Sequence, residues 1–238
     1  MRSECLQRLP HAPASGVALW RVDLDSDAAG LSPEWLDPGE VERGGRFRDP
    51  VDARRFLVSR MALRRVLATA LGRPPGSFIY SRGESGKPCI ADAAVHFSLS
   101  RSGPLALIGL GHECPIGVDV EFVRHLPDME ALVRLHFTEQ EQGAWAASDE
   151  AARDLRFLEC WTRKEACVKA LGTGLRTPPG QVQAGFAAGA GKATVRNGPV
   201  ACEMPVWSVV PRDGVVAAVA IWRGQTPLCP PKRGQSGV

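Results

Sequence analysis

The chain has 238 residues, of which 44% are hydrophobic and 23% charged, and its formal net charge is +3. This balance is typical of a globular protein with one large or two small domains, and the charge is too small to require a nucleic-acid partner. No segment approaches the ~20 apolar residues of a membrane helix, and no apolar run at the N-terminus resembles a signal peptide. The seven scattered cysteines form no CxxC pair, so we expect a cytoplasmic protein without a zinc site or a disulfide framework.

The first half of the chain predicts one long helix among several strands. Residues 1–15 are rich in proline and polar residues and predict a flexible segment. The helix is expected over residues 52–71, because apolar residues recur at helical spacing up to a stop at Gly72. The strands are expected at residues 17–24, 77–80, 95–100, 105–110 and 116–121.

The second half repeats this order. A helix is expected over residues 151–171, with a stop at Gly172, and a shorter helix is expected after Thr138, which begins a capping-box pattern. The strands are expected at residues 183–186, 193–196, 204–210 and 215–222, before a flexible tail over residues 224–238.

Both long helices contain the tripeptide RFL and end in ALG, about one hundred residues apart. A duplicated unit would explain this match, and a cleft between two such units is a usual ligand site. Chance similarity of two amphipathic helices is the alternative. Duplication predicts an N-terminal subdomain over residues 16–115 and a C-terminal subdomain over residues 116–223.

Two carboxylates lie one residue apart in the predicted strand 116–121, which reads IGVDVE. Because side chains alternate along a strand, Asp119 and Glu121 share one face, while Val118 and Val120 share the other. Two carboxylates this close resist desolvation unless water covers them or a cation lies between them.

The helix 151–171 offers a third carboxylate and a lysine. Glu165 and Lys169 lie one turn apart at the edge of its apolar stripe, and taken alone they are most simply a solvated pair. Together with Asp119 and Glu121 they form a set suited to Mg²⁺, which prefers oxygen ligands and often shares them with substrate phosphates. Spacing alone leaves open whether this helix reaches the strand.

Several motifs together resemble a known family. IGVDVE, HFTEQE at 136–141 and WTRKEACVKALGTGL at 161–175 resemble the paired motifs of the Sfp-type 4'-phosphopantetheinyl transferases, in their WxxKEA form. GKPC at 86–89 and HFSLSRSG at 96–103 resemble that family's GKP and FNxSHSG blocks. The resemblance implies an α+β fold of two similar subdomains in a pseudo-twofold arrangement, with coenzyme A in the cleft between them.

The resemblance also implies which residues bind the metal and the phosphates. Asp119, Glu121 and Glu165 would hold Mg²⁺, and Lys169 would contact the diphosphate of coenzyme A. A carboxylate or a metal-bound water would take the proton of the acceptor serine, and Glu165 is the candidate base. Glu141, at the family's FxxxE position, is the other acidic candidate, although its place in the capping box offers it a structural role.

The nucleotide end of coenzyme A would be bound by residues of the first half. By resemblance, Lys87 and Pro88 would line the adenine side, and Ser100 would contact the ribose phosphate. Arg101 stands where the family usually has a histidine that contacts the 3'-phosphate, and an arginine keeps the positive charge at every relevant pH.

Two further arginines are candidates for the 3'-phosphate. Arg43 lies in an arginine-rich region, and Arg55 precedes Phe56, which stands where relatives carry a small polar residue. The alternative for both arginines is that they lie on a solvated helix surface. For Lys87 the alternative is an exposed lysine in a Gly-Lys-Pro turn, and for Ser100 it is an ordinary strand position without a ligand.

The implied reaction is transfer of 4'-phosphopantetheine from coenzyme A to a serine of an acyl, peptidyl or aryl carrier protein, which releases adenosine 3',5'-bisphosphate. The carrier would serve fatty acid, polyketide or nonribosomal peptide synthesis, and we expect a monomer without nucleic-acid or membrane partners. Two alternatives stay open: a non-catalytic module that binds coenzyme A or a nucleotide, and a Mg²⁺-dependent phosphodiesterase or nuclease that uses the same carboxylates.

Overall fold

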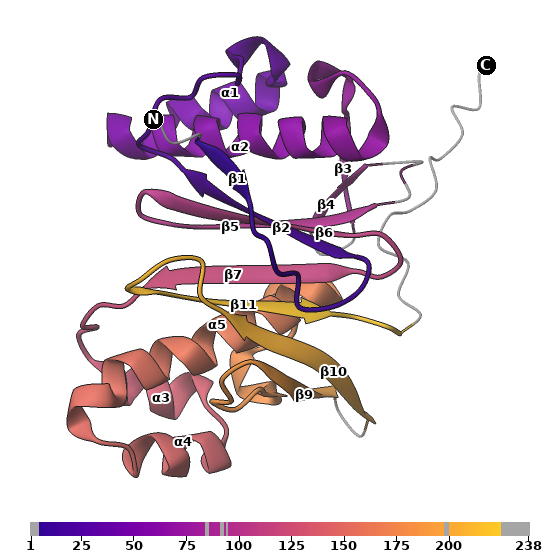
Figure 1. Cartoon of the computed structure of the whole chain (residues 1–238). Helices are drawn as coiled ribbons and strands as arrows, with labels where there is room; N and C mark the ends of the chain where they lie inside the picture. Colours follow the sequence, from indigo (N-terminus) through magenta and orange to yellow (C-terminus); the bar gives the residue numbers. More distant parts are fainter. Residues whose placement is uncertain (1–4, 84–85, 91–92, 94, 198–199, 225–238) are drawn as a thin grey trace.

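The computed structural model describes residues 5–83, 86–90, 93, 95–197 and 200–224. Two β-sheets lie face to face, and one long helix covers the outer face of each (Figure 1). None of the helices in the described ranges has the length and apolar character that crossing a membrane requires.

The first sheet has four antiparallel strands in the order β1-β2-β6-β5. Its strands are β1 (Leu6–Arg8), β2 (Val17–Asp23), β5 (His96–Ser102) and β6 (Leu105–Gly111), and β3 (Tyr80–Arg82) pairs separately with β4 (Pro88–Ile90). Helix α2 (Pro50–Leu71) packs on the outer face, where Val58 and Leu63 join Phe97 and Ile108 in one apolar core. Helix α1 (Pro38–Gly45) lies beside α2.

The second sheet has five antiparallel strands in the order β7-β11-β10-β9-β8. Its strands are β7 (Ile116–Phe122), β8 (Val182–Gln183), β9 (Ala190–Asn197), β10 (Val200–Val209) and β11 (Val215–Ile221). Helix α5 (Arg153–Leu171) covers its outer face, while α3 (Met129–His136) and α4 (Glu139–Ala146) pack near the start of α5 (Figure 1). Single 3₁₀ turns occur at Pro33–Trp35, Pro75–Ser77, Glu150–Ala152, Gly174–Arg176 and Pro179–Gln181.

The α+β class expected from the sequence is confirmed, as are the two long helices and their C-terminal ends before Gly72 and Gly172. Gly72 and Gly172 both adopt the left-handed conformation after α2 and α5, with φ of 62° and 69°. This conformation favours glycine, and it lets each cap donate its backbone N–H to a carbonyl of the last turn.

Several expectations differ from the structure. Residues Leu6–Arg8 form β1 within the segment 1–15, for which the sequence predicts flexibility, because they pair with β2 and the neighbouring Cys5 is buried beside Asp23. Prolines at 74 and 75 favour a 3₁₀ turn over the expected strand 77–80, so β3 begins only at Tyr80. The expected strand 183–186 is found only as β8 (Val182–Gln183), because Gly185 takes a left-handed conformation with φ of 64°. Helices α1 and α3 and strand β4 are not among the predicted elements, and the tail after residue 224 lies outside the described residues.

The inner faces of the two sheets share an apolar core. Leu105 and Leu107 of β6 meet Val118 and Val120 of β7, all of them fully buried. The alternation expected for IGVDVE is therefore confirmed, because the valines face the other sheet. We propose the division into residues 16–115 and 116–223 on this basis, since the first range carries α2 and strands β2, β5 and β6 of the first sheet, and the second range carries the second sheet and α5. Strand β1 of the first sheet precedes this division.

Gly117 sets the distance between α5 and β7. A Cβ atom at this position would lie 2.0 Å from the carbonyl oxygen of Ala166 and 2.3 Å from the backbone nitrogen of Ala170. Both are main-chain atoms of α5, so a side chain at 117 could fit only if the helix moved away. This close approach brings the last two turns of α5 against the strand that carries Asp119 and Glu121.

We expect Gly117→Ala to lower the free energy of unfolding by about 3 kcal/mol or more, because overpacking against backbone cannot be relieved by side-chain rotation. Urea unfolding measures the change. Gly143→Ala, in the middle of α4, is the matched control, since nothing lies within 4 Å of the place that its methyl group would take and alanine is the better helix former. Equal stability of the two variants would show that α5 does not lie on Gly117.

Candidate active site

Serine side chains of β5 form hydrogen bonds with β7 and so join the two sheets, and we call this junction the seam. Ser98 and Ser102 lie on one face of β5, and their hydroxyl oxygens accept hydrogen bonds from the backbone N–H groups of Val118 and Phe122, at 3.1 and 3.3 Å. These bonds satisfy edge groups of β7 that no neighbouring strand of its own sheet reaches. They hold β7, and with it the two predicted carboxylates, directly against β5.

Asp119 lies at the centre of this seam and is 4% exposed. Its Oδ1 accepts hydrogen bonds from the Ser100 hydroxyl at 2.7 Å and from the Lys169 ammonium at 2.6 Å, whereas its buried Oδ2 has no hydrogen-bond partner among the described residues. Burial raises the pKa of Asp119, although Lys169 and Ser100 act in the opposite direction. A buried carboxylate oxygen without a partner is costly, so this atom is suited to a ligand that supplies positive charge.

Glu121 lies on the same face of β7, closer to solvent. Its Oε2 accepts hydrogen bonds from the Ser102 hydroxyl at 2.7 Å and from Arg124 at 2.9 Å. The side chain of Arg124 is half exposed, so this ion pair is screened by water and weak. Glu121 can therefore exchange this partner for a stronger cation at little cost.

Helix α5 brings Glu165 to the two strand carboxylates, which the spacing in the sequence could not establish. Burial raises the pKa of Glu165, and the charges of Asp119 and Glu121 raise it further against the opposing effect of Lys169. Among the residues that the structure describes, no three carboxylate, histidine or cysteine side chains are already gathered closely enough to hold a metal ion. The three carboxylates would have to turn toward one another to share one.

The side chain of Lys169 extends from α5 to the seam. Its ammonium donates to the Ser100 hydroxyl at 2.9 Å as well as to Asp119, and the side chain remains 30% exposed. Positive charge thus lies at the solvent-facing side of a buried acidic residue. An incoming anion can reach this ammonium from solvent.

Lys87 faces inward rather than toward solvent. Its ammonium donates to the backbone carbonyls of Ile116 and Lys169, at 2.8 and 2.6 Å, and burial lowers the pKa of Lys87 to about 8. The carbonyl of Lys169 belongs to the last turn of α5, where a cation is favourable. Lys87 therefore joins the start of β4 to β7 and α5, and Pro88 beside it lines a small cavity with His96.

A second group of cations lies on the opposite face of β5. The Arg101 guanidinium lies over the rings of Phe47 and Phe56, 5.8 and 5.2 Å from their centroids, and Arg43 of α1 lies 5.4 Å from the Phe56 centroid. Burial and the nearby Arg43 charge lower the pKa of Arg101. Ser100 and Arg101 thus point to different sides of the strand.

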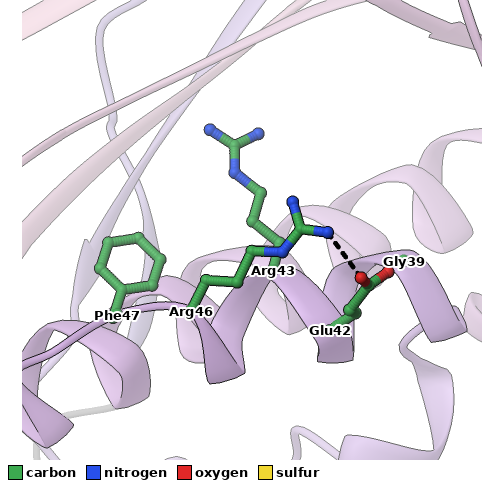
Figure 2. Close-up of a pocket in the computed structure, with 5 residues that line it drawn as sticks. All are labelled: Gly39, Glu42, Arg43, Arg46 and Phe47. Atoms are coloured by element: carbon green, nitrogen blue, oxygen red, sulfur yellow. Dashed lines mark hydrogen bonds and ion pairs between the residues drawn. The ribbon is translucent and has the colours of Figure 1, made fainter.

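Arg43 opens onto a hollow of about 570 Å³ at the end of α1, lined by Gly39, Glu42, Arg43, Arg46 and Phe47 (Figure 2). Arg46 turns toward Glu42, at 2.5 Å, while Arg43 extends away from that carboxylate. The hollow therefore combines an aromatic wall with a guanidinium directed toward a solvent-filled space.

Arg55 is not gathered with Arg43 and Arg101. Its guanidinium forms two hydrogen bonds with the Asp25 carboxylate, at 2.8 and 2.6 Å, and also lies 3.8 Å from Asp52. A phosphate would have to compete with both acidic residues for it.

Glu141 forms part of the framework of the C-terminal half. It closes the expected capping box with Thr138, and it accepts hydrogen bonds from the backbone N–H groups of Ala184 and Gly185. It also pairs with the fully buried ammonium of Lys164 at 2.5 Å. Burial acts to raise the pKa of Glu141, but Lys164 and the backbone donors together hold it below its ordinary value.

Some residues of the site are absent from the set that the sequence predicts. Ser98 and Ser102 could have been found, because they share the period of two with Ser100 in SLSRS. Arg124, the partner of Glu121, and Phe47, which contacts Arg101, carry no such pattern. Their roles depend on chain segments that meet only in the folded protein.

Comparisons with known proteins show what the chain is similar to. A sequence profile of the 4'-phosphopantetheinyl transferase superfamily matches residues 115–219. The chain is 31% identical over 225 residues to the 4'-phosphopantetheinyl transferase HetI of a Nostoc species, a match that covers 86% of this chain and 87% of HetI. It is 29% identical over 145 residues to the 4'-phosphopantetheinyl transferase Sfp of Bacillus subtilis, a match that covers 60% of this chain and 63% of Sfp.

The chain therefore belongs to the 4'-phosphopantetheinyl transferase family, a class of transferases. The resemblance to the Sfp type, expected from the motifs between residues 86 and 175, is confirmed by the matches to Sfp and to similar transferases of Aneurinibacillus migulanus and Bacillus pumilus.

We expect Lys164→Met to lower the free energy of unfolding by about 3–5 kcal/mol, because it leaves the Glu141 carboxylate buried without its cation. Thermal and urea unfolding measure the loss. Lys192→Met is the matched control and should be neutral, since its partner Glu203 and Lys192 itself are 63% and 73% exposed. A Lys164→Met protein of normal stability would contradict a structural role for the Glu141 pair.

Proposed function

We propose that the chain transfers the 4'-phosphopantetheine group from coenzyme A to a serine of a carrier protein in a Mg²⁺-dependent reaction. The observation that carries the proposal is the seam itself: Asp119, Glu121 and Glu165 lie within electrostatic reach of one another beside Lys169, and one buried oxygen of Asp119 lacks a partner among the described residues. This arrangement needs positive charge, which is what a phosphate-bound divalent cation supplies.

The residues present fit a Mg²⁺ ion. Hard oxygen ligands are available from three carboxylates, and the buried Asp119 Oδ2 atom has no hydrogen-bond partner among the described residues, so it can accept a cation. Asp119, Glu121 and Glu165 would hold the ion. When bound, Mg²⁺ would neutralise and orient the diphosphate oxygens of coenzyme A.

Lys169 would stabilise the negative charge that grows on the departing phosphate. Its ammonium is partly exposed and held in place by Asp119 and Ser100, so it requires little reorganisation when the diphosphate bond breaks. The leaving group, adenosine 3',5'-bisphosphate, keeps its 3'-phosphate, for which Arg43 and Arg101 are the proposed ligands. They are held on the same aromatic ring, and Phe47 beside them supports the hollow.

Of the remaining candidates, Ser100 would act by holding Asp119 and Lys169, and Lys87 would act mainly through the backbone carbonyls that it binds. Pro88 would then lie at the adenine side. Arg55 stays a candidate that must first leave Asp25.

Glu165 is the proposed base for the acceptor serine. The charges of Asp119 and Glu121 act on its carboxylate, so it lies at the proposed site, whereas Glu141 is buried in an ion pair with Lys164 and has its pKa lowered. Glu165 would take the hydroxyl proton as the serine oxygen attacks the phosphorus that bears the pantetheine arm.

The proposal also covers the acceptor proteins, the cellular location and the oligomeric state. Acyl, peptidyl or aryl carrier proteins of fatty acid, polyketide or nonribosomal peptide synthesis are the proposed acceptors, and the protein would act in the cytoplasm as a monomer. Both sides of the site already belong to one chain, so no second copy is needed to complete it.

The test is intact mass spectrometry of a panel of apo carrier proteins after incubation with the protein, coenzyme A and Mg²⁺. We expect a gain of one phosphopantetheine, which EDTA abolishes. Asp119→Ala should also abolish it while the protein stays folded, because the variant removes the oxygen that lacks a partner. A folded Asp119→Ala protein with normal turnover would contradict the assigned metal site.

The same panel separates the alternatives. A non-catalytic module would bind coenzyme A and modify no carrier. A phosphodiesterase would release adenosine 3',5'-bisphosphate from coenzyme A with no carrier present, so a carrier-free reaction followed by chromatography distinguishes it.

We expect Lys169→Ala to lower kcat by about a hundredfold and to change KM for coenzyme A less, because its contact strengthens as charge develops on the leaving phosphate. Steady-state kinetics against coenzyme A measure both constants. Lys192→Ala, on an exposed pair remote in sequence from the motifs, is the control. A rise in KM with unchanged kcat would mean that Lys169 only binds the ground state.

A further inference from the structure

Two carboxylates at the N-terminus of helix α1 bind both the backbone of α1 and arginines of α2. Asp37 and Glu40 form a capping box: Asp37 Oδ1 accepts from the backbone N–H of Glu40 at 2.8 Å, and Glu40 Oε2 accepts from that of Asp37 at 3.1 Å. The same carboxylates bind arginines of α2. Arg64 donates to Glu40 at 2.7 Å and to Asp37 at 2.9 Å, and Arg60 donates to Glu40 at 2.6 Å.

The centre of this network, where Arg64 binds Glu40, is buried. Arg64 is fully buried and Glu40 is 6% exposed. Arg64 also donates to the backbone carbonyls of Pro75 and Phe78, at 3.2 and 3.1 Å, so its guanidinium has acceptors on every side. A buried ion pair whose groups are all hydrogen-bonded fixes geometry, because any displacement leaves a charge without a partner.

The clamp of Asp37, Glu40, Arg60 and Arg64 determines where the end of α1 lies. An eight-residue helix has little stability of its own, so its position depends on tertiary contacts. One turn after Glu40, Gly44 lies against α2: a Cβ atom there would be 2.7 Å from Leu57 Cδ2. Helix α1 therefore contacts α2 through the clamp at one end and through Gly44 at the other.

Arg43 is placed by these two contacts. It lies between Glu40 and Gly44 on the same side of the helix, and its guanidinium rests on Phe56 of α2. Neither Asp37 nor Glu40 lines the hollow into which Arg43 opens. Any effect of these carboxylates on a ligand in the hollow must therefore pass through the position of α1.

We propose that Asp37 and Glu40 are positioning residues: through Arg60 and Arg64 they fix α1 so that Arg43 meets the phosphorylated nucleotide of coenzyme A. This inference rests on the proposed function, because it takes the hollow as the nucleotide site. It adds that affinity for coenzyme A depends on a buried ion-pair network that does not touch the ligand.

The test compares Glu40→Gln with the wild-type chain. Glutamine keeps the capping box but loses the charge that binds Arg60 and Arg64. We expect KM for coenzyme A and its calorimetric Kd without carrier to rise about tenfold, the effect of losing roughly one charge-assisted hydrogen bond to phosphate, while kcat changes less than about twofold. Asp37→Asn is the second variant, since asparagine is an equally good N-cap, and it should show a smaller rise.

Two controls separate positioning from general destabilisation. Val66→Ala removes a buried contact of α2 in the core of the same half, away from α1, and should lower the melting temperature without changing affinity for coenzyme A. Glu203→Gln removes an exposed ion pair and should change neither. Hydrogen exchange without coenzyme A should show faster exchange at residues 39–46 in Glu40→Gln than in Val66→Ala.

The outcomes distinguish this inference from the proposed function. If the wild-type chain binds and uses coenzyme A but Glu40→Gln binds it equally well, or if Val66→Ala weakens binding as much as Glu40→Gln does, the positioning role is wrong and the function stands. If the wild-type chain does not bind coenzyme A, both fall. A loss of kcat in Glu40→Gln with unchanged affinity would also overturn the positioning role.

Discussion

The close approach of α5 to β7 at Gly117 determines where the charged groups of the site lie. Without a side chain at this position, backbone atoms of the helix rest directly on the strand, and Glu165 and Lys169 come within electrostatic reach of Asp119 and Glu121. The apolar residues of β7 meanwhile face the other sheet. One face of β7 thus packs in the apolar core, and the other face carries Asp119 and Glu121. Gly117 allows α5 to lie on the face with the carboxylates.

The two halves of the molecule supply different kinds of charge. The second half gathers carboxylates, which are partly neutralised by Lys169 and by serines that reach across from β5. The first half places the guanidinium groups of Arg43 and Arg101 on the ring of Phe56. This separation suits a ligand with a cation-binding diphosphate at one end and a phosphate at the other, because each end finds charge of the opposite sign or a metal to bridge it.

Much of the fold could be predicted because its long elements carry strong local patterns. The two long helices have regular apolar spacing and end at left-handed glycines. In IGVDVE, core valines alternate with the carboxylates of the site. The sequence pattern does not predict helix α1, because its two turns are too short for a clear apolar period, although Asp37 and Glu40 have the spacing of a capping box. The ion pairs of Arg64 join residues more than twenty positions apart, so only packing could place them. For the same reason the pairing of Arg55 with Asp25, thirty residues away along the chain, could not be read from local spacing.

The serine seam also affects how the two proposed subdomains relate during folding. Leu105, Leu107, Val118 and Val120 are buried only because the sheets cover one another, and backbone N–H groups of β7 are satisfied by serines of the other half. A fragment containing either half alone would expose an apolar sheet face and an unpaired strand edge, a combination that promotes aggregation. We therefore expect the two proposed subdomains to fold as one cooperative unit rather than as two separable modules.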